Sequence, residues 1–364
     1  MLTEILIKLA LAGAALFAVL NLAGIQTWVE RKQSAMIQDR VGANRAYFAL
    51  PWWWAAPINW VLRKLGGLGL LHPLADVIKL LTKEDFVPAT GDRFLHTLAP
   101  WISVFFALVT FAAIPFGNQL MIGGRAIDLQ VAHLDAALLW VLAFASIGIY
   151  GVILAGTVSG SNYATIGGLR AAAQMFAYEI ALGVSLVGVV LWYGTLDLQS
   201  IIRQQGGTLF GWLPAWGVFV QPIACVVFMT AALAGTKRIP FDLPEGESEI
   251  IGYFVEYSGM KFGLFFLTDF VETVLVAALT TVLFFGGWQI PWLAADACSP
   301  NVMALLGVGA FTLKVAFFLW LFMMIRWTLP RFRYDQLMGL GWKGLFPLSL
   351  ANIGLTSIAR LLIK

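Results

Sequence analysis

The feature that most constrains the fold is a series of eight apolar segments, each about 20 residues long. An apolar helix of this length spans the roughly 30 Å hydrocarbon core of a bilayer. The chain is 60% hydrophobic and only 12% charged, whereas a soluble domain has about 25% charged residues. We therefore expect an all-α integral membrane protein that forms a single polytopic domain over residues 1–364. The expected spans lie near 5–28, 97–116, 135–158, 174–193, 217–235, 262–285, 302–325 and 344–363.

The distribution of Lys and Arg predicts the orientation. Of the 23 basic residues, 17 lie in the connections 29–96, 159–173, 236–261 and 326–343. Because basic loops stay in the cytoplasm, these four connections are expected inside and both termini outside. The first apolar stretch is longer than a signal-peptide core, so it is expected to be the first transmembrane helix.

The first inner loop contains a Trp-rich segment, with Trp52, Trp53, Trp54 and Trp60 followed by Arg63 and Lys64. Aromatic rings favour headgroup depth and basic side chains reach phosphates, so this segment is expected to lie as an amphipathic element in the membrane interface. The alternative is a Trp-rich loop packed on protein.

Several kinds of site are disfavoured by the sequence. The two cysteines, Cys225 and Cys298, are too few for a thiolate metal site, and His residues do not occur in pairs at ligand spacing. The glycine motifs of nucleotide-binding loops are missing. We expect this chain to bind no metal, no iron–sulfur cluster and no nucleotide.

Ionisable side chains inside apolar segments are the most informative residues. Each costs about 2.5–3.5 kcal/mol on insertion scales and usually marks a polar pathway or a paired site. Asp269 and Glu272 are three residues apart, so they share one helix face. A carboxylate near the end of a span could instead simply reach water, and Lys314 could instead form a static ion pair that holds two helices together. The candidates are Asp135, Glu179, Asp269, Glu272 and Lys314.

The third inner loop is dense in carboxylates. Neighbouring carboxylates raise each other's pKa, so such a cluster can hold and pass protons near neutral pH. A solvated acidic loop is the alternative, but Pro240, Phe241 and Pro244 argue against a loosely held loop. The carboxylates are Asp242, Glu245, Glu247, Glu249 and Glu256.

Stretches along nearly the whole chain resemble the family of the membrane-embedded H subunit of NADH:quinone oxidoreductase, respiratory complex I. In order, they begin with the segments W-V-E-R-K (28–32) and Q-D-R-V-G-A-N-R (38–45), then P-L-A-D-V-I-K (73–79) and K-E-D (83–85). They continue with G-L-R-A-A-A-Q-M-F-A-Y-E-I (168–180), R-I-P-F-D-L-P-E-G-E-S-E (238–249), E-Y-S-G-M (256–260) and L-P-R-F-R-Y-D-Q-L-M (329–338). The chain departs from the family pattern at Ala43, His72, Lys237 and Asp269, and its Trp-rich insert near 46–70 is long.

The resemblance implies eight transmembrane helices with an amphipathic helix after the first, and a role in a proton-translocating complex. It places an acidic path at Glu179, Glu245, Glu247, Glu256 and Glu272, to which Asp135 and Asp269 are added as buried candidates. It also places part of a quinone chamber at Glu30, Arg31, Arg40, Asp76, Arg238 and Asp242, although the arginines could instead anchor lipid phosphates.

The same resemblance sets expectations for ligands and partners. Quinone, for example ubiquinone, would be the substrate, and this chain would carry no redox centre. Flavin and iron–sulfur clusters would belong to partner subunits of the soluble arm, next to other membrane-arm subunits in a bacterial inner (plasma) membrane. One alternative is the homologous anchor of a membrane-bound hydrogenase or of a ferredoxin- or F420-linked dehydrogenase. Another is a secondary transporter, which predicts inverted repeats and broken helix pairs.

Overall fold

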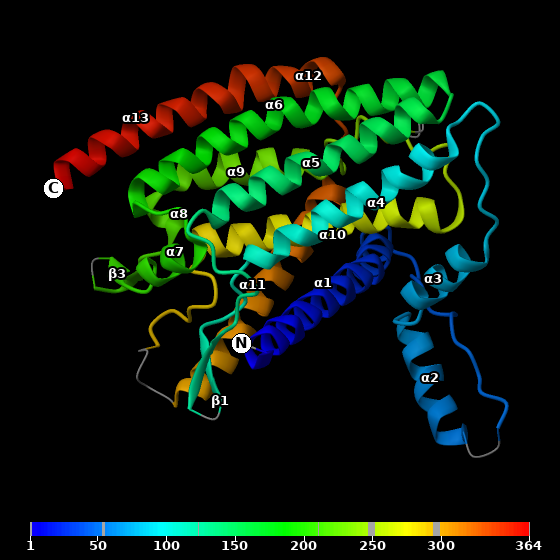
Figure 1. The fold of residues 1–364 in the computed structure, drawn as a ribbon, viewed down its shortest axis with the longest axis horizontal. Coiled ribbons are helices and arrows are strands. Elements are labelled where there is room, and N and C mark those ends of the chain that lie inside the picture. Colours follow the sequence, from blue (N-terminus) through cyan, green and yellow to red (C-terminus); the bar gives the residue numbers. More distant parts are fainter. Residues whose placement is uncertain are drawn as a thin grey trace.

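A computed structural model describes residues 2–52, 55–122, 124–209, 211–246, 252–293 and 299–363. Within these residues, seven helical segments are long and apolar enough to cross a membrane. Most run side by side as a layered bundle (Figure 1). The segments are α1 (Leu2–Ile37), α4 (Arg93–Val109, continued by the 3-10 turn Thr110–Ala113), α5 (Ala137–Val158), α6 (Asn162–Tyr193), α10 (Gly259–Phe284), α11 (Pro300–Thr328), and α12 (Tyr334–Gly339) joined to α13 (Phe346–Ile363) through the π-helical turn Leu340–Leu345.

The fifth expected span, 217–235, differs from the prediction. It is divided into a single turn, α8 (Gly217–Val220), and α9 (Pro222–Gly235). The helix breaks at Gln221, whose φ is −132°, because proline disfavours helical geometry in the residue before it. With 14 residues, α9 is about 21 Å long, which is less than the hydrocarbon thickness.

Helix α6 begins much earlier than expected. The predicted inner loop 159–173 is helical from Asn162 onward, so α6 has 32 residues. Its added turns are rich in Gly and Ala, which let helix backbones approach closely. A Cβ at Gly156 of α5 would lie only 3.1 Å from the Cα of Gly168. A search for long apolar segments finds only the strongly apolar part of such a helix, and so it missed the first turns of α6.

Helices α6 and α10 run in the same direction. Near the start of α6, Gly167 lies against the backbone of Gly252 and Tyr253, shortly before α10 begins. Beyond the end of α6, Gln205 donates a hydrogen bond of 2.9 Å to the carbonyl of Val282, near the end of α10. The chain between the two helices must therefore return along the bundle, and α9 makes part of this return.

The two termini lie at one end of the bundle. Lys8 donates to the carbonyl of Gln130, which precedes α5. Arg360 lies beside Gly194, which follows α6. Leu138 and Leu196 join these two regions through a backbone hydrogen bond of 3.1 Å. Both chain ends therefore sit at the end of the bundle where α6 finishes.

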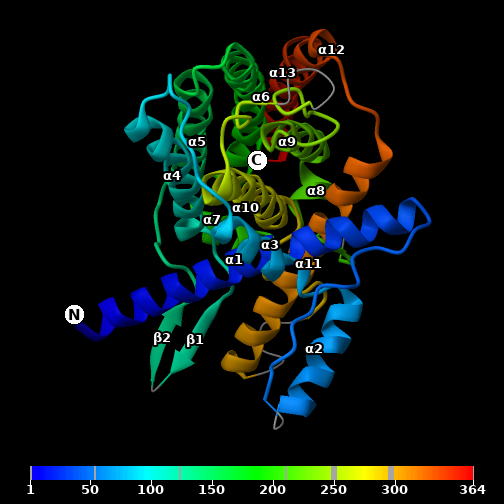
Figure 2. The ribbon, with the colours of Figure 1, turned by 90° about the vertical axis from the view of Figure 1, so that its right-hand side faces the viewer.

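Smaller elements flank the bundle. The expected interfacial segment contains α2 (Ala56–Leu68), which is bent by 92° from α3 (His72–Thr82) and projects from the body of the molecule (Figure 2). Its Trp60 is 59% exposed, and the Lys64 ammonium lies 3.9 Å above the Trp60 ring. Trp53 and Trp54 lie outside the described residues. The other small elements are α7 (Leu198–Gln204) and the antiparallel hairpins β1 (Gln119–Ile122) with β2 (Arg125–Asp128) and β3 (Thr208–Leu209) with β4 (Leu213–Pro214).

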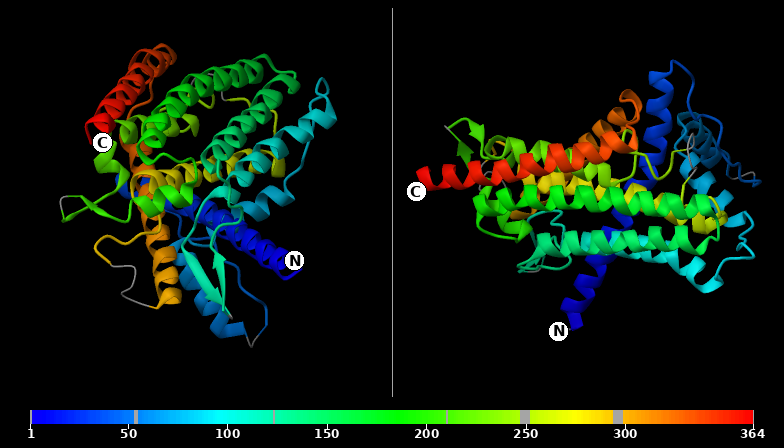
Figure 3. Two further views of the ribbon diagram at one scale, coloured as in Figure 1. Left: turned by 60° about the vertical axis from the view of Figure 1, so that its left-hand side comes forward. Right: turned by 90° about the horizontal axis from the view of Figure 1, so that it is seen from above.

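Helix α10 is the most enclosed of the membrane-crossing helices. In its apolar 18-residue stretch 72% of the residues are buried, against 11% in that of α1. Figure 3 shows α1 inclined across the other helices at one side of the bundle. Ionisable side chains on α10 therefore face protein.

Candidate functional site

A buried lysine lies between the two carboxylates of α10. Lys237 follows α9, and its side chain is 1% exposed. Its Nζ lies 3.2 Å from Asp269 Oδ1 and 3.9 Å from Glu272 Oε2. Asp269 and Glu272 share one helix face, as their spacing predicts, since both carboxylates face the same ammonium group. We call Glu245, Asp269 and Glu272 the carboxylate cluster.

Glu245 joins the cluster from the loop after α9. The Tyr253 hydroxyl donates to Glu245 Oε1 over 3.4 Å, and the Tyr253 ring lies 5.7 Å from the Lys237 ammonium. Burial and the nearby Asp269 raise the pKa of Glu245 well above its usual value, while the Lys237 ammonium opposes this rise. The surroundings of Glu245 therefore favour its protonated form more than water does.

A second ionic group connects α1 to this loop. Glu30 of α1 binds Arg326 at 2.7 Å through one oxygen and Arg238 at 3.3 Å through the other. The Arg238 guanidinium also lies 3.8 Å above the ring of Phe270. Arg238, which binds Glu30, directly follows Lys237, which binds the carboxylate cluster. The two ionic groups are therefore neighbours along one loop.

Glu179 and Glu272 line the same cavity. This cavity has a volume of about 140 Å³ and lies between α5, α6, α9 and α10, with Ser146 and Thr236 as further polar lining residues. A cavity of this size has room for water, which needs two to four polar partners. The remaining lining is mostly apolar, so the carboxylates face a partly open space between helices.

Asp242 pairs with a different arginine. Its Oδ2 accepts a hydrogen bond of 2.8 Å from Arg331, in the connection between α11 and α12. Burial raises the pKa of Asp242 to about 6, although the Arg331 guanidinium lowers it. Asp242 thus lies close to the cluster but has its own cation.

The remaining chamber candidates lie at the exposed end of α1. Arg31 pairs with Asp76 of α3 at 2.5 Å, and both side chains are substantially exposed. Arg40 binds Gln38 at 2.6 Å and Ser34 at 3.3 Å. Arg31 and Glu30 are consecutive. Helix α1 therefore contacts α3 through one residue and two partly buried arginines through the residue before it.

Two other predicted residues, Asp135 and Glu256, are not among the described contacts of the cluster. Asp135 is exposed and lies just before α5, at the end of the bundle where the termini lie. Glu256 lies in the turn before α10, near His96. Glu247 and Glu249 lie outside the described residues.

Lys314 holds a helix end. Its ammonium donates to the carbonyls of Phe285, Gly287 and Gln289 at 2.7, 3.0 and 2.7 Å, and it lies 4.7 Å from the Trp216 ring. These carbonyls follow the last turn of α10, where a cation is favourable. Lys314 therefore anchors the end of α10 to α11, in place of the carboxylate pairing considered from the sequence.

Sequence reasoning did not select Lys237, Arg326 or Tyr253 as site residues. Lys237 and Arg326 each lie within two residues of the end of an expected apolar segment, where a basic residue is ordinarily assigned to the membrane surface. The available signal was that Lys237 precedes five acidic positions and departs from the family pattern. Tyr253 carried no signal beyond its place in the acidic loop.

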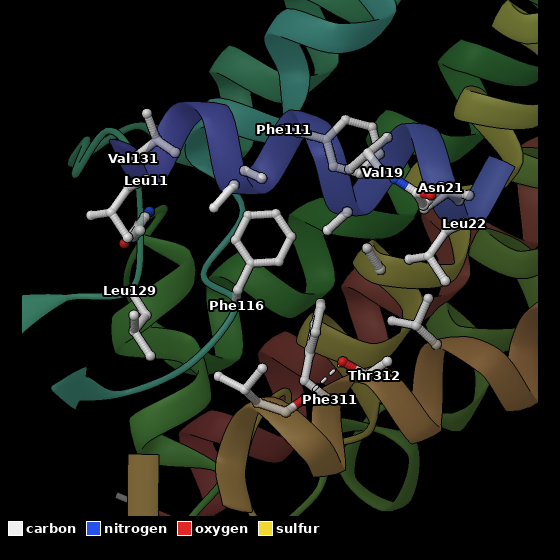
Figure 4. Close-up of a pocket in the computed structure, with 18 of the residues that line it drawn as sticks. Leu11, Val19, Asn21, Leu22, Phe111, Phe116, Leu129, Val131, Phe311 and Thr312 are labelled. Atoms are coloured by element: carbon white, nitrogen blue, oxygen red, sulfur yellow. Dashed lines mark hydrogen bonds between the residues drawn. The ribbon is translucent and has the colours of Figure 1, made fainter. Parts of the chain in front are cut away.

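A larger cavity lies elsewhere in the bundle. It has a volume of about 380 Å³ and lies between α1, α10 and α11. Phe111, Phe116 and Phe311 surround it (Figure 4). Its lining residues within the described chain are apolar except for Asn21, Gln130 and Thr312. It is separate from the carboxylate cluster and has no acid–base chemistry of its own.

Comparisons with known proteins agree with this picture. The model of the NADH dehydrogenase family matches residues 9–357. The chain is 45% identical to the NADH-quinone oxidoreductase H subunit of Thermomicrobium roseum, over 94% of this chain and 93% of the relative. It is 41% identical to the H subunit of Flavobacterium psychrophilum, over 99% and 98%, and 45% identical to an H subunit of Geobacter metallireducens, over 97% and 96%. These three relatives are named as H subunits of NADH-quinone oxidoreductase, and the chain therefore belongs to the NADH dehydrogenase family.

Proposed function

We propose that this chain is the membrane subunit of a proton-translocating NADH:quinone oxidoreductase that forms part of the quinone chamber and couples quinone reduction to proton movement. The names of its relatives support the complex, and they favour it over a hydrogenase or ferredoxin-linked anchor. The site geometry supports the coupling role.

The observation that carries the coupling role is the shared position of Glu272. It belongs to the cluster around Lys237 and also lines the cavity with Glu179. A proton that reaches Glu245 can pass to Glu272 and then, through water in the cavity, to Glu179 on α6. Buried carboxylates that face each other across a hydrated space are typical of proton pathways in membranes.

The quinone chamber belongs at the exposed inner end of α1. Arg31, Asp76 and Arg40 gather there around an amphipathic pair of helices, α2 and α3, while Glu30, Arg238 and Asp242 lie deeper. A polar headgroup with an apolar tail suits a group of polar side chains beside the bilayer surface. Quinone reduction there would consume protons next to the carboxylate cluster.

In this proposal the redox centres belong to other subunits. Partner subunits of the soluble arm supply flavin and iron–sulfur clusters, and this chain supplies no redox centre. Further membrane-arm subunits cover part of the bundle. The chain crosses the bacterial inner membrane eight times, with α9 as the fifth crossing and both termini outside. The excess of Lys and Arg in the four inner connections supports this orientation.

Single replacements of Glu272 and Glu179 by Gln test the coupling role in membranes that contain the assembled complex. Each should lower NADH:quinone activity by about tenfold or more, the scale of a positioned proton-transfer group. NADH oxidation by an artificial acceptor that bypasses quinone should stay near the wild-type rate, since it requires only the soluble arm.

Asp128→Asn is the matched control, because this carboxylate lies on the β2 hairpin strand at the other end of the bundle and binds Gln119. It should leave quinone activity and proton pumping unchanged. Wild-type quinone reduction and pumping in an assembled Glu272→Gln complex would overturn the proposal.

A further inference from the structure

Lys237 is held in a defined backbone conformation. Its φ is +55°, a left-handed value that non-glycine residues seldom adopt. Thr236 donates to the carbonyl of Leu233 at 2.8 Å. The Gln174 amide of α6 donates to the carbonyls of Ala234 and Phe241, at 2.7 and 2.8 Å, on either side of Lys237. The loop is therefore fixed to α6, and the ammonium is directed at α10.

The Lys237 ammonium lies closer to one carboxylate of α10 than to the other. Its Nζ is within hydrogen-bonding distance of Asp269, at 3.2 Å, but 3.9 Å from Glu272. The Asp269 side chain is 7% exposed and faces the lysine, whereas Glu272 also lines the cavity with Glu179. One carboxylate is thus bound to a fixed cation, while the other has access to a space that can hold water.

Among the described residues, the ionisable groups that act on Lys237 and its partners lie on three elements. Asp269 and Glu272 are on α10; Glu245, Arg238 and the Tyr253 hydroxyl are on the loop 236–258; Glu179 faces Glu272 from α6. Burial disfavours the charged ammonium, but Glu272, Asp269 and Glu245 together outweigh it and raise the pKa of Lys237. The carboxylates around the lysine therefore favour its charged form.

We propose that Lys237 is the positioning residue that binds Asp269 as its ion-pair partner and so leaves Glu272 as the carboxylate of the pair that takes up and releases a proton. The inference rests on the proposed function, since it assigns roles within the same path. Without the ammonium, two enclosed carboxylates one helical turn apart would share a proton, because like charges cannot both ionise readily at that spacing. Proton release from Glu272 would then require a higher pH.

The test compares Lys237→Met with the double variant Lys237→Met/Asp269→Asn in membranes that contain the complex. The single variant removes the cation alone, so the pH profile of NADH:quinone activity should move to higher pH by at least one unit. The double variant removes the cation together with its partner anion, so the profile should return toward that of the wild type. Lys237→Arg keeps the charge and should keep the wild-type profile.

NADH oxidation by an artificial acceptor reports the amount of assembled complex in each variant. If Lys237 only ties the loop to α10, the single variant loses assembled complex, the remaining complex keeps the wild-type pH profile, and the inference is wrong. A shifted profile that the double variant does not restore also overturns it. A defective Glu272→Gln complex combined with an unshifted Lys237→Met profile removes this inference alone, whereas a fully active Glu272→Gln complex removes the proposed function.

Discussion

Asp242 illustrates how burial and an ion pair compete at a single residue. Burial raises its pKa to about 6 from an ordinary 3.8, so burial outweighs the opposing effect of Arg331. A carboxyl whose folded-state pKa is raised stabilises the fold only while it is protonated, and this contribution is lost as pH rises through the folded-state pKa. Compared with Asp242→Asn, the wild-type complex should therefore lose thermal stability between about pH 4 and pH 6, with little further change above pH 7.

Thermal inactivation of quinone activity, measured for both proteins from pH 5 to pH 7.5, checks this prediction. Because the other titrating groups are common to both proteins, the difference isolates Asp242. A wild-type complex that gains stability over the variant as pH rises would mean that pairing with Arg331 outweighs burial.

The residues of the candidate site were predictable to the extent that their chemistry is unusual for their surroundings. Glu179, Asp269 and Glu272 stood out because carboxylates are expensive in apolar segments. Their grouping depended on Lys237, whose burial follows from the return of α9 halfway along α10 and from the backbone turn at Thr236. No local pattern encodes that turn, so the cation at the centre of the site could be found only in the fold.

At the scale of helices, the packing of α4 against α5 depends on a glycine. A Cβ at Gly151 would meet the Ser103 hydroxyl and lie 2.6 Å from the carbonyl oxygen of Ala99. Gly151→Ala should therefore push the two helices apart at a cost of about 1–3 kcal/mol and lower the amount of assembled complex. Native gels together with artificial-acceptor activity measure this amount.

Gly354→Ala on α13 is the matched control, because a Cβ there meets no other atom within 4 Å. The same substitution should leave assembly unchanged, since alanine favours helix by up to about 1 kcal/mol over glycine. Equal amounts of complex from both variants would contradict the close contact between α4 and α5.

Helices were predictable where a long apolar run has no interruption, as in α5, α10 and α11. Prediction failed in opposite directions at α6 and α9. The first turns of α6 are helical through Ala-rich and Gly-rich packing on α5, which hydropathy does not register. The segment 217–235 met the length criterion, but Pro222 ends helical geometry at Gln221, and the remaining helix has only 14 residues.

For the whole molecule, the direction of the chain decides whether the short helix α9 counts as a membrane crossing. Since α6 and α10 run in the same direction, residues 217–258 must pass from one membrane face to the other.

In a full chain with both native cysteines replaced by Ser, Trp212→Cys should react with an impermeant thiol reagent added to spheroplasts. Val255→Cys, shortly before α10, and Tyr163→Cys, at the start of α6, should react only after permeabilisation. All three positions are exposed in the described chain, at 67%, 38% and 66%. Reaction of Val255→Cys from outside would place the loop 236–258 on the outer face, separate the carboxylate cluster from the cytoplasm, and reverse the direction in which protons enter the proposed path.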